Sequence, residues 1–306
     1  MGTPEFAVES LDAIVQAGYE VAAVVTVPDR QTGRGLKVTY SDVKEYALQH
    51  QLPVLQPEKL KDEAFLAQLR ALEADLFVVV AFRMLPREVW AMPRLGTFNL
   101  HASLLPRYRG AAPLNWAIIN GEHETGITTF LLNERIDEGA ILLQESTPIA
   151  PTDTVGDIHD RLARMGRGLV VRTIEGLAAG TITPRPQEGE PTPAPKIFKA
   201  DCAIDWRLPA RRIVDHVRGL SPYPATTMLM EDDRGRQQSI KVYEVALEEA
   251  ENGIAGSIVT DRKSFFKVAA EGGFVQIRSL QMSGKKRISV EEFLRGYDVS
   301  SWKMME

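Results

Sequence analysis

The chain has 306 residues, 44% of them hydrophobic, with 36 Lys and Arg against 41 Asp and Glu and a single cysteine, Cys202. This length suggests two domains of ordinary size with sizeable cores. No apolar run approaches the roughly 18 residues of a membrane span, and we expect no signal peptide. Because one cysteine cannot form an internal disulfide or a metal cluster by itself, we expect a cytoplasmic protein without a membrane partner.

The charge is unevenly distributed along the chain. Residues 196–306 contain 18 Lys and Arg and 16 Asp and Glu, whereas residues 1–195 contain 18 and 25. A positive second half is compatible with a polyanionic partner, although scattered charges on a solvated surface give the same totals and are favoured by composition alone. Composition therefore leaves a nucleic-acid partner open.

The first half alternates helical patterns with apolar runs rich in β-formers. Thr3 suits the N-cap and Pro4 the first position of the first helix. Helices are predicted over 5–17, 40–50 and 63–71, and buried strands over 19–27, 76–81 and 97–101. Such alternation is typical of an α/β fold with a doubly wound, mostly parallel Rossmann-like sheet covered on both faces.

The first residues pose a problem for this sheet. Met1-Gly2-Thr3-Pro4 begins at a strand-to-helix turn, although a doubly wound sheet normally starts with a central strand that leads into that turn. We expect either that the sequence starts late or that the sheet lacks this strand. In the second case the flanking strands would expose unpaired backbone edges, which predicts poor stability or a rearranged sheet.

The second half adds to the sheet and then changes character. Strands are predicted over 127–132 and 140–148 and a helix over 152–179, and the five prolines of residues 181–198 indicate a linker. A helix over 209–219 precedes five short strands that indicate a small oligonucleotide-binding-like β-barrel, over 226–230, 239–246, 257–260, 265–269 and 274–280. We therefore predict an N-terminal α/β domain over 1–180, a linker over 181–204 and a C-terminal β-barrel domain over 205–306.

Three polar residues suggest acyl transfer to an amine. Asn99 and His101 are two apart at the end of a strand, so they face the same way, at the edge where parallel sheets bind ligands. An amide that donates to the oxyanion of a tetrahedral adduct typically stabilises it by about 3–4 kcal/mol, and an imidazole polarises the carbonyl or handles a proton. Asp137 ends a second apolar run and either holds the imidazole tautomer or relays protons through water.

The same residues have ordinary structural explanations. A histidine at a strand end is more often a satisfied structural residue, an asparagine there often caps a turn, and Asp137 before Glu138-Gly139 suits a tight turn. No serine or cysteine nucleophile stands out beside a base, so direct attack by a substrate amine is favoured over a covalent intermediate. Spacing alone leaves the function open.

At these residues the chain resembles a known family. Asn99-Leu100-His101, S-L-L-P at 103–106, R-Y-R-G-A-A-P at 107–113 and I-D-E-G at 136–139 are similar to the core of the folate-dependent formyltransferases. G-T-P-E-F at 2–6 and P-D-R-Q-T-G-R-G-L-K at 28–37 are similar to the members that act on methionyl-tRNA. The resemblance covers almost the whole chain, and the segment 103–113 is specific.

The resemblance implies formyl transfer from the co-substrate 10-formyltetrahydrofolate to the α-amine of methionine on initiator tRNA, for translation initiation. Asn99, His101 and Asp137 are then the catalytic trio, and no metal is needed. Asn99 and His101 would bind the oxyanion, while Asp137, through water, would help to remove the ammonium proton and protonate N10 of the leaving folate. The implied folate-contacting residues are Ser103, Leu104, Leu105, Pro106, Phe82, Arg83, Met84 and Leu85. At Phe82-Arg83 the chain departs from the Tyr-Gly that is common in the family.

The resemblance also implies a tRNA-binding surface and a monomer. The glycine-rich loop 28–37 lacks the spacing of a phosphate loop and looks like the insertion that approaches the acceptor stem. The expected tRNA-binding residues are Arg30, Arg34, Lys37, Lys199, Lys285, Lys286 and Arg287. Small barrels with a mild positive balance suit contacts to the RNA backbone, although a mobile surface loop and a solvated charged face are the ordinary alternatives.

Other functions stay open beside this one. A formyltransferase with the same core could act on an amino sugar nucleotide, or on glycinamide ribonucleotide, although the latter enzyme usually lacks a second domain. A catalytically silent RNA-binding relative would have no need of the intact trio. A dinucleotide dehydrogenase is excluded because the first turn lacks G-x-G-x-x-G.

Overall fold

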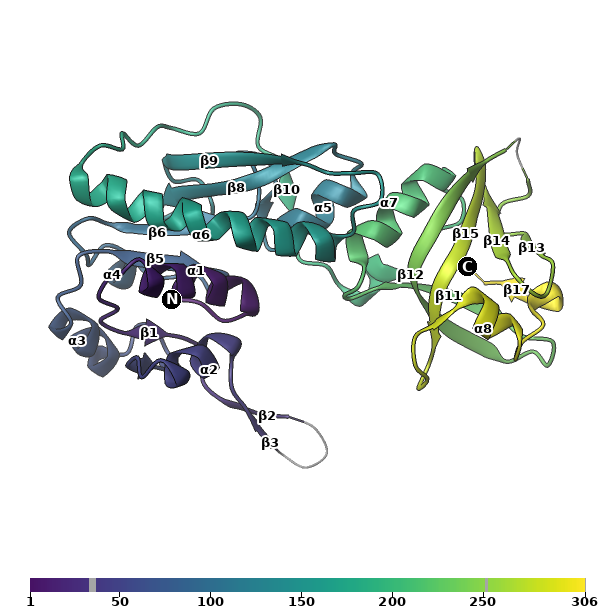
Figure 1. Ribbon diagram of the computed structural model, residues 1–306, viewed down its shortest axis with the longest axis horizontal. Helices are drawn as coiled ribbons and strands as arrows, with labels where there is room; N and C mark the ends of the chain where they lie inside the picture. Colours follow the sequence, from purple (N-terminus) through teal and green to yellow (C-terminus); the bar gives the residue numbers. More distant parts are fainter. Residues whose placement is uncertain (33–36, 251–252, 306) are drawn as a thin grey trace. The chain divides into compact units, whose positions relative to one another are not determined.

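The computed structural model describes residues 1–32, 37–250 and 253–305 and is shown as a ribbon in Figure 1. The chain forms two compact units. Unit 1 consists of residues 1–113, 125–147 and 159–194, and unit 2 consists of residues 114–124, 148–158 and 195–306. Each unit has its own cluster of buried hydrophobic side chains.

Unit 1 is built on a four-stranded sheet in the order β5-β6-β8-β9 (Phe77–Val80, Thr97–His101, Glu124–Leu131 and Ile141–Pro148). β5 and β6 are parallel, and β8 is antiparallel to β6. Two further parallel pairs are separate from this sheet. One joins β1 (Val24–Val25) to β4 (Val54–Leu55), and the other joins β7 (Arg109–Gly110) to β10 (Pro193–Ala194). The α/β fold class is confirmed.

Four helices start within three residues of the predicted positions, namely α1 (Glu5–Gln16), α2 (Asp42–Gln49), α3 (Glu63–Ala71) and α6 (Val155–Ala179), most of which lies in unit 1. The short α4 (Arg87–Trp90) was not predicted. Figure 1 shows α6 running along the sheet. This packing is close, because a Cβ on Gly166 of α6 would lie 2.8 Å from Leu100 Cδ2 of β6, and the hydroxyls of Thr173 and Thr129 are hydrogen-bonded at 2.9 Å.

The start of α1 differs from the prediction. The N-cap is Pro4, which makes no side-chain cap hydrogen bond, so the prediction that Thr3 caps this helix is wrong. The backbone of Pro4 is extended (φ −85°, ψ 173°), which moves the first helical residue to Glu5. In α3 the cap follows the expected pattern, since Asp62 Oδ1 accepts the N–H of Phe65 at 3.0 Å.

Two predicted segments also differ. The strand predicted over 19–27 is reduced to the two residues of β1. The segment predicted as a loop over 28–37 includes β2 (Arg30–Thr32) and the start of β3 (Lys37–Thr39), which pair antiparallel. The sequence signal for a loop came from glycines at 33 and 35, which lie outside the described residues.

Met1 and Gly2 bridge the four-stranded sheet and the β1–β4 pair. The Met1 amino group donates to Val78 O at 2.7 Å and the Met1 carbonyl accepts from Val80 N at 3.0 Å, both in β5. On the other side, the Gly2 N–H donates to Val25 O of β1 at 3.1 Å. Burial lowers the pKa of the Met1 amino group to about 5. Among the described residues, these two therefore stand where the predicted central strand of the sheet would end.

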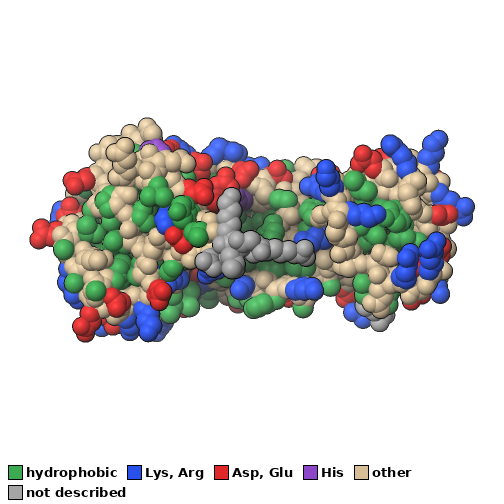
Figure 2. All heavy atoms as spheres, turned by 90° about the horizontal axis from the view of Figure 1, so that it is seen from below, with side chains coloured by type: hydrophobic (Ala, Val, Ile, Leu, Met, Phe, Trp, Pro, Cys, Tyr) green, Lys and Arg blue, Asp and Glu red, His purple; other side chains and the backbone are tan. Residues whose placement is uncertain are grey.

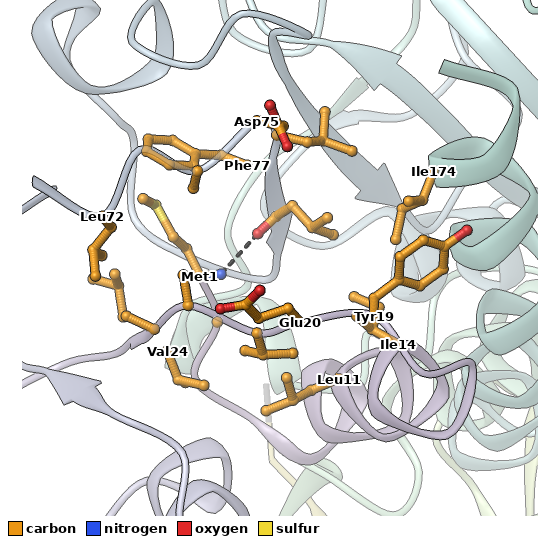
Figure 3. A pocket seen from close by; sticks show the side chains of 18 of the residues that line it. Met1, Leu11, Ile14, Tyr19, Glu20, Val24, Leu72, Asp75, Phe77 and Ile174 are labelled. Atoms are coloured by element: carbon orange, nitrogen blue, oxygen red, sulfur yellow. Dashed lines mark hydrogen bonds between the residues drawn. The ribbon is translucent and has the colours of Figure 1, made fainter. Parts of the chain in front are cut away.

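A cavity of about 400 Å³ lies beside Met1 (Figure 3). Apolar side chains of α1, of β5 and of the segment 19–25 line it, among them Leu11, Ile14 and Phe77. None of Asn99, His101 and Asp137 is part of its lining. The segment 19–23 lines this cavity and joins no strand, so the strand predicted over 19–27 is confirmed only at β1.

Unit 2 contains a seven-stranded antiparallel sheet that is curled into a barrel-like form. Its strand order is β13-β14-β15-β12-β11-β17, with β16 on β15. The strands are β11 (Thr226–Glu231), β12 (Gln237–Glu249), β13 (Ile258–Thr260), β14 (Phe266–Ala270), β15 (Gly273–Met282), β16 (Ile288–Ser289) and β17 (Lys303–Met304). A register shift near Val242 and Glu244 bends the long β12, as bulges do in barrels.

The helical elements of unit 2 are α5 (Pro113–Ile119), η1 (Lys199–Cys202), α7 (Ala210–Leu220), α8 (Val290–Leu294) and η2 (Val299–Ser301). α7 buries Ile213, Val214 and Val217 in the same cluster as the inner faces of β12 and β15. Across the part of the chain that is described, no helix is both long and apolar enough to cross a membrane.

Candidate active site

β6 places Asn99 and His101 side by side. They are two residues apart near the carboxyl end of the strand and project from the same face. The intervening Leu100 and the preceding Phe98 project from the other face and are 3% and 0% exposed. Packing of this apolar face in the core therefore fixes the direction of the two polar side chains.

A backbone carbonyl fixes the tautomer of His101. Nε2 of the ring lies 2.8 Å from Tyr108 O, and because a carbonyl only accepts hydrogen bonds, Nε2 carries a proton. In the neutral ring Nδ1 therefore holds the lone pair. The ring is buried and lies nearly perpendicular to the ring of Phe130, with 6.4 Å between centroids. Nδ1 is thus the nitrogen left for chemistry.

Asp137 reaches the same place from the loop between β8 and β9. Its Oδ2 accepts the N–H of Gly110 at 2.9 Å and lies 3.9 Å from His101 Nδ1. This separation is longer than a hydrogen bond. Both side chains are nevertheless shielded, with 7% of His101 and 13% of Asp137 exposed. The structure therefore brings the carboxylate and Nδ1 close together in a shielded position.

The amide of Asn99 carries an unsatisfied group. Its Oδ1 is buried and has no hydrogen-bond partner among the residues that the structure describes. An unpaired buried acceptor costs about 1–3 kcal/mol, and such groups in native proteins call for an explanation in binding or catalysis. A ligand N–H or O–H at this end of β6 would satisfy it.

The segment 103–106 lies against β8 beside His101. The carbonyl of Ser103 accepts the hydroxyl of Thr128 at 2.6 Å, and the same hydroxyl oxygen accepts the N–H of Leu105 at 3.2 Å. Ser103, Leu105 and Pro106 are buried, whereas Leu104 is half-buried. The segment is therefore held rigidly through its backbone, and Leu104 is its more accessible side chain.

The run after β5 is occupied mainly by structural contacts. The Arg83 guanidinium donates to the carbonyls of residues 57 and 58. Leu85 is 7% exposed, and Phe82 packs against the same hydrophobic cluster. Met84 is 73% exposed. Arg83 thus ties two loops together, and Met84 is the member of this run that is open to a ligand.

The residues expected to bind tRNA lie in three places. Arg34 and the side chain of Lys37 are outside the described residues, whereas Arg30 next to them is exposed. Lys199 is exposed in η1 of unit 2. On the face shown in Figure 2, Lys and Arg side chains are prominent over unit 2.

The third place is the turn after β15, where Lys285, Lys286 and Arg287 are all exposed. Lys285 donates to the hydroxyl of Tyr297. Arg287 is paired with Glu244 and donates to Ser279 Oγ at 2.7 Å. Lys285 and Arg287 are therefore already engaged by side chains within unit 2.

Three further residues complete the site, and they were not singled out as site residues from the sequence. Tyr108 and Gly110 supply a carbonyl and an N–H to His101 and Asp137. Gln187 donates from Nε2 to Asp137 O at 2.8 Å and to Gly139 O at 2.9 Å. Tyr108 and Gly110 belong to the family-like string 107–113, but Gln187 lies in the proline-rich segment and has no local sequence signal.

The residues that the structure describes include no group of three or more His, Cys, Asp or Glu placed to hold a metal ion. An amide, an imidazole and a carboxylate at the end of a buried strand, without a serine or cysteine nucleophile among them, suit an enzyme that transfers a small acyl group. The fold and the site together define this class.

Comparison with known proteins identifies the family. Residues 1–174 match the formyl transferase family, and residues 196–298 match the formyl transferase C-terminal domain. The chain belongs to the formyl transferase family and is a formyltransferase. A curated relative from Bacteroides fragilis, named methionyl-tRNA formyltransferase, is 54% identical over 98% of this chain and 94% of its own length. A relative of the same name from Parabacteroides distasonis is 55% identical over 97% of this chain and 94% of its own.

A solved structure has the same fold at low sequence identity. It is an N-formyltransferase from Helicobacter canadensis in complex with folinic acid and dTDP-3-aminofucose. It superposes with a TM-score of 0.65 and 19% identity, over 94% of this chain and 97% of that chain. This likeness shows that the chain shares the fold of that protein over most of its length.

Proposed function

We propose that the chain transfers the formyl group of 10-formyltetrahydrofolate to the α-amine of methionine on initiator tRNA. The observation that carries the proposal is the convergence of Asn99, His101 and Asp137 at the end of β6, with a buried amide oxygen that lacks a partner among the described residues. Relatives more than 50% identical over nearly the whole chain carry the name of this activity. A fold neighbour was crystallised with a formylated folate.

The reaction needs an uncharged amine and a polarised formyl group. The amine nitrogen attacks the formyl carbon, and the C=O oxygen becomes an oxyanion. The Asn99 amide donates to this oxyanion from Nδ2, and its Oδ1 accepts an N–H of the attacking amine. A preorganised donor of this kind contributes about 3–4 kcal/mol of transition-state stabilisation.

His101 and Asp137 handle the proton. Nε2 is committed to Tyr108 O, so the ring takes up or gives a proton at Nδ1 only, and it can donate to the oxyanion only while Nδ1 is protonated. One N–H proton leaves the amine as the new C–N bond forms, and one proton is delivered to N10 of the folate as the old C–N bond breaks. Asp137 relays it, and the 3.9 Å between its Oδ2 and Nδ1 supports this role. Because a protonated amine cannot attack, activity should fall in acid.

Arg30 of β2 and the exposed basic residues of unit 2 would hold the tRNA. Contacts from lysine and arginine to phosphates provide affinity and orientation without reading bases. In this proposal Lys199, Lys285 and Lys286 bind the tRNA and take no part in the formyl transfer. Such contacts predict that tRNA use weakens steeply with salt, whereas use of the folate does not.

A substrate panel tests the proposal. The purified chain is incubated with 10-formyltetrahydrofolate and methionine-charged initiator tRNA, free methionine or a dTDP-linked amino sugar, and the formylated product is measured by mass spectrometry. Formylation of the charged tRNA alone supports the proposal. Formylation of the sugar nucleotide in its place, or of no acceptor, would refute it.

A further inference from the structure

The proline-rich segment before unit 2 makes ordered contacts with the active-site loops. Arg185 exchanges two backbone hydrogen bonds with Ile141, of 2.8 and 2.9 Å. Further on, Thr192 O accepts the N–H of Arg109 at 2.9 Å within the β7–β10 pair. Residues 185–194 therefore form part of unit 1, although their composition is typical of a linker.

Two of the residues that this segment contacts are held in the left-handed backbone region. Tyr108 has φ 60° and Asp137 has φ 54°. That region is unfavourable for a side chain as bulky as tyrosine and persists only where neighbours enforce it. These two residues supply the groups that surround His101, namely the carbonyl on Nε2 and the carboxylate near Nδ1.

Gln187 enforces the conformation at Asp137. Both N–H groups of its amide are used, one on Asp137 O and one on Gly139 O, at 2.8 and 2.9 Å. Its Oε1 accepts from Arg109 Nη2 at 2.7 Å. Arg109 Nη1 lies in turn 3.2 Å from Glu138 Oε1. One side chain thus joins the loop of Asp137 to β7.

Thr192 does the same for Tyr108. Its Oγ1 accepts the N–H of Tyr108 at 2.8 Å, next to the carbonyl that binds His101. Ala194 O accepts the N–H of Ala112 at 3.2 Å and closes the pair from the other end. The loop that fixes the His101 tautomer is therefore pinned on both sides of Tyr108.

We infer that Gln187 and Thr192 are positioning residues for the formyl transfer, and that the segment 185–194 is a brace of the active site. The inference rests on the proposed function for its kinetic readout. The hydrogen bonds of both side chains go to the backbones around Asp137 and Tyr108 and to Arg109. They act by holding those backbones, and misplacement of reacting groups by about 1 Å can cost about 100-fold in rate.

The test uses pairs of matched variants. Gln187→Glu keeps the size and the acceptor for Arg109 but loses both N–H donors, whereas Glu188→Gln makes the reverse change at the exposed neighbour. Thr192→Val removes the hydroxyl with little change in shape, and Thr192→Ser restores it. We expect Gln187→Glu and Thr192→Val to lower kcat about 10- to 100-fold with KM for both substrates changed less than about threefold. The two control variants should stay close to the parent.

A second readout does not depend on activity. In protein labelled with ¹⁵N-histidine, the ring nitrogens of His101, one of five histidines, report its tautomer and surroundings. We expect these shifts to move in Gln187→Glu and Thr192→Val and to be unchanged in Glu188→Gln. Parent-like kcat and parent-like His101 shifts in both variants would overturn the inference. If the parent protein fails to formylate tRNA, the proposed function falls, and the ring shifts still decide whether the segment positions His101.

Discussion

Replacing Gly110 with alanine should disturb the active site through the backbone. Gly110 has φ 129° in β7, and a Cβ there would lie 2.5 Å from Ala194 O and 3.0 Å from Ala194 C in β10. Both are backbone atoms, so no side-chain rotation relieves the clash. Overpacking costs about 1–3 kcal/mol, and a positive φ adds about 1–2 kcal/mol for a residue with a Cβ.

We therefore expect Gly110→Ala to lower the free energy of unfolding by about 2–5 kcal/mol. If β7 separates from β10 to relieve the clash, the N–H that holds Asp137 Oδ2 at 2.9 Å moves as well, and kcat should fall with it. Urea unfolding and formylation kinetics measure the two effects. Gly168→Ala is the control, because a Cβ added to Gly168 in α6 would meet no atom of the described residues within 4 Å.

The control should raise stability by up to about 1 kcal/mol, as alanine does in an exposed helix interior. A Gly110→Ala protein whose stability lies within about 0.5 kcal/mol of the parent, with parent-like kcat, would refute the view that the β7–β10 pair supports the site.

Three further predictions concern charge. Asp137→Asn keeps the shape of the side chain but removes its charge, and kcat should fall about 10²- to 10⁴-fold in the formylation assay. Burial lowers the pKa of the Met1 amino group from 8.0 to about 5, so the unfolded state binds more protons between these values and stability should rise from pH 5 to pH 8. This rise in the free energy of unfolding is at most about 4 kcal/mol, and acetylation of the amino group should remove it. Urea unfolding at both pH values measures it, and an equal change with pH in the parent and the acetylated protein would show that the reasoning is wrong. Lys285→Ala with Lys286→Ala should weaken tRNA binding and reduce its salt dependence by about two charges without altering KM for folate; an unchanged salt slope would count against the cluster as a tRNA contact.

Elements whose signal is local could be predicted from the sequence. β6 has its predicted ends, Thr97 and His101, because its apolar residues alternate with polar ones over a run bounded by Gly96 and the loop that follows. α3 likewise has its predicted ends at Glu63 and Ala71, since Asp62 caps it. The placement of Asn99 and His101 on one face followed directly from the strand period.

Features that depend on distant partners could not be predicted. The length of β1 depends on its neighbours, because β1 pairs with β4 on one side and accepts a hydrogen bond from Gly2 on the other. The apolar run 19–27 contains no signal for either neighbour. Gln187 contacts residues 50 and 78 positions away, Asp137 and Arg109. The five prolines nearby are typical of a linker, although proline is also compatible with the extended backbone of β10.

The left-handed conformation of Tyr108 was also invisible in the sequence, whereas Asp137 before Glu138-Gly139 already suited a tight turn. Glycine and asparagine indicate such positions, but tyrosine does not, and its conformation is imposed by the hydrogen bonds to Thr192 and His101. The tautomer of His101 depends on that imposed carbonyl. The sequence therefore predicts that His101 and Asp137 lie together, while the nitrogen of His101 that carries the proton follows only from the structure.

The most direct test of the proposed chemistry is the rate of a single turnover in Asn99→Ala with charged initiator tRNA and 10-formyltetrahydrofolate both saturating. Removing the oxyanion donor should slow the formyl transfer about 10²- to 10³-fold while the affinities for both substrates stay close to those of the parent. A variant that transfers the formyl group at nearly the parental rate would contradict the account.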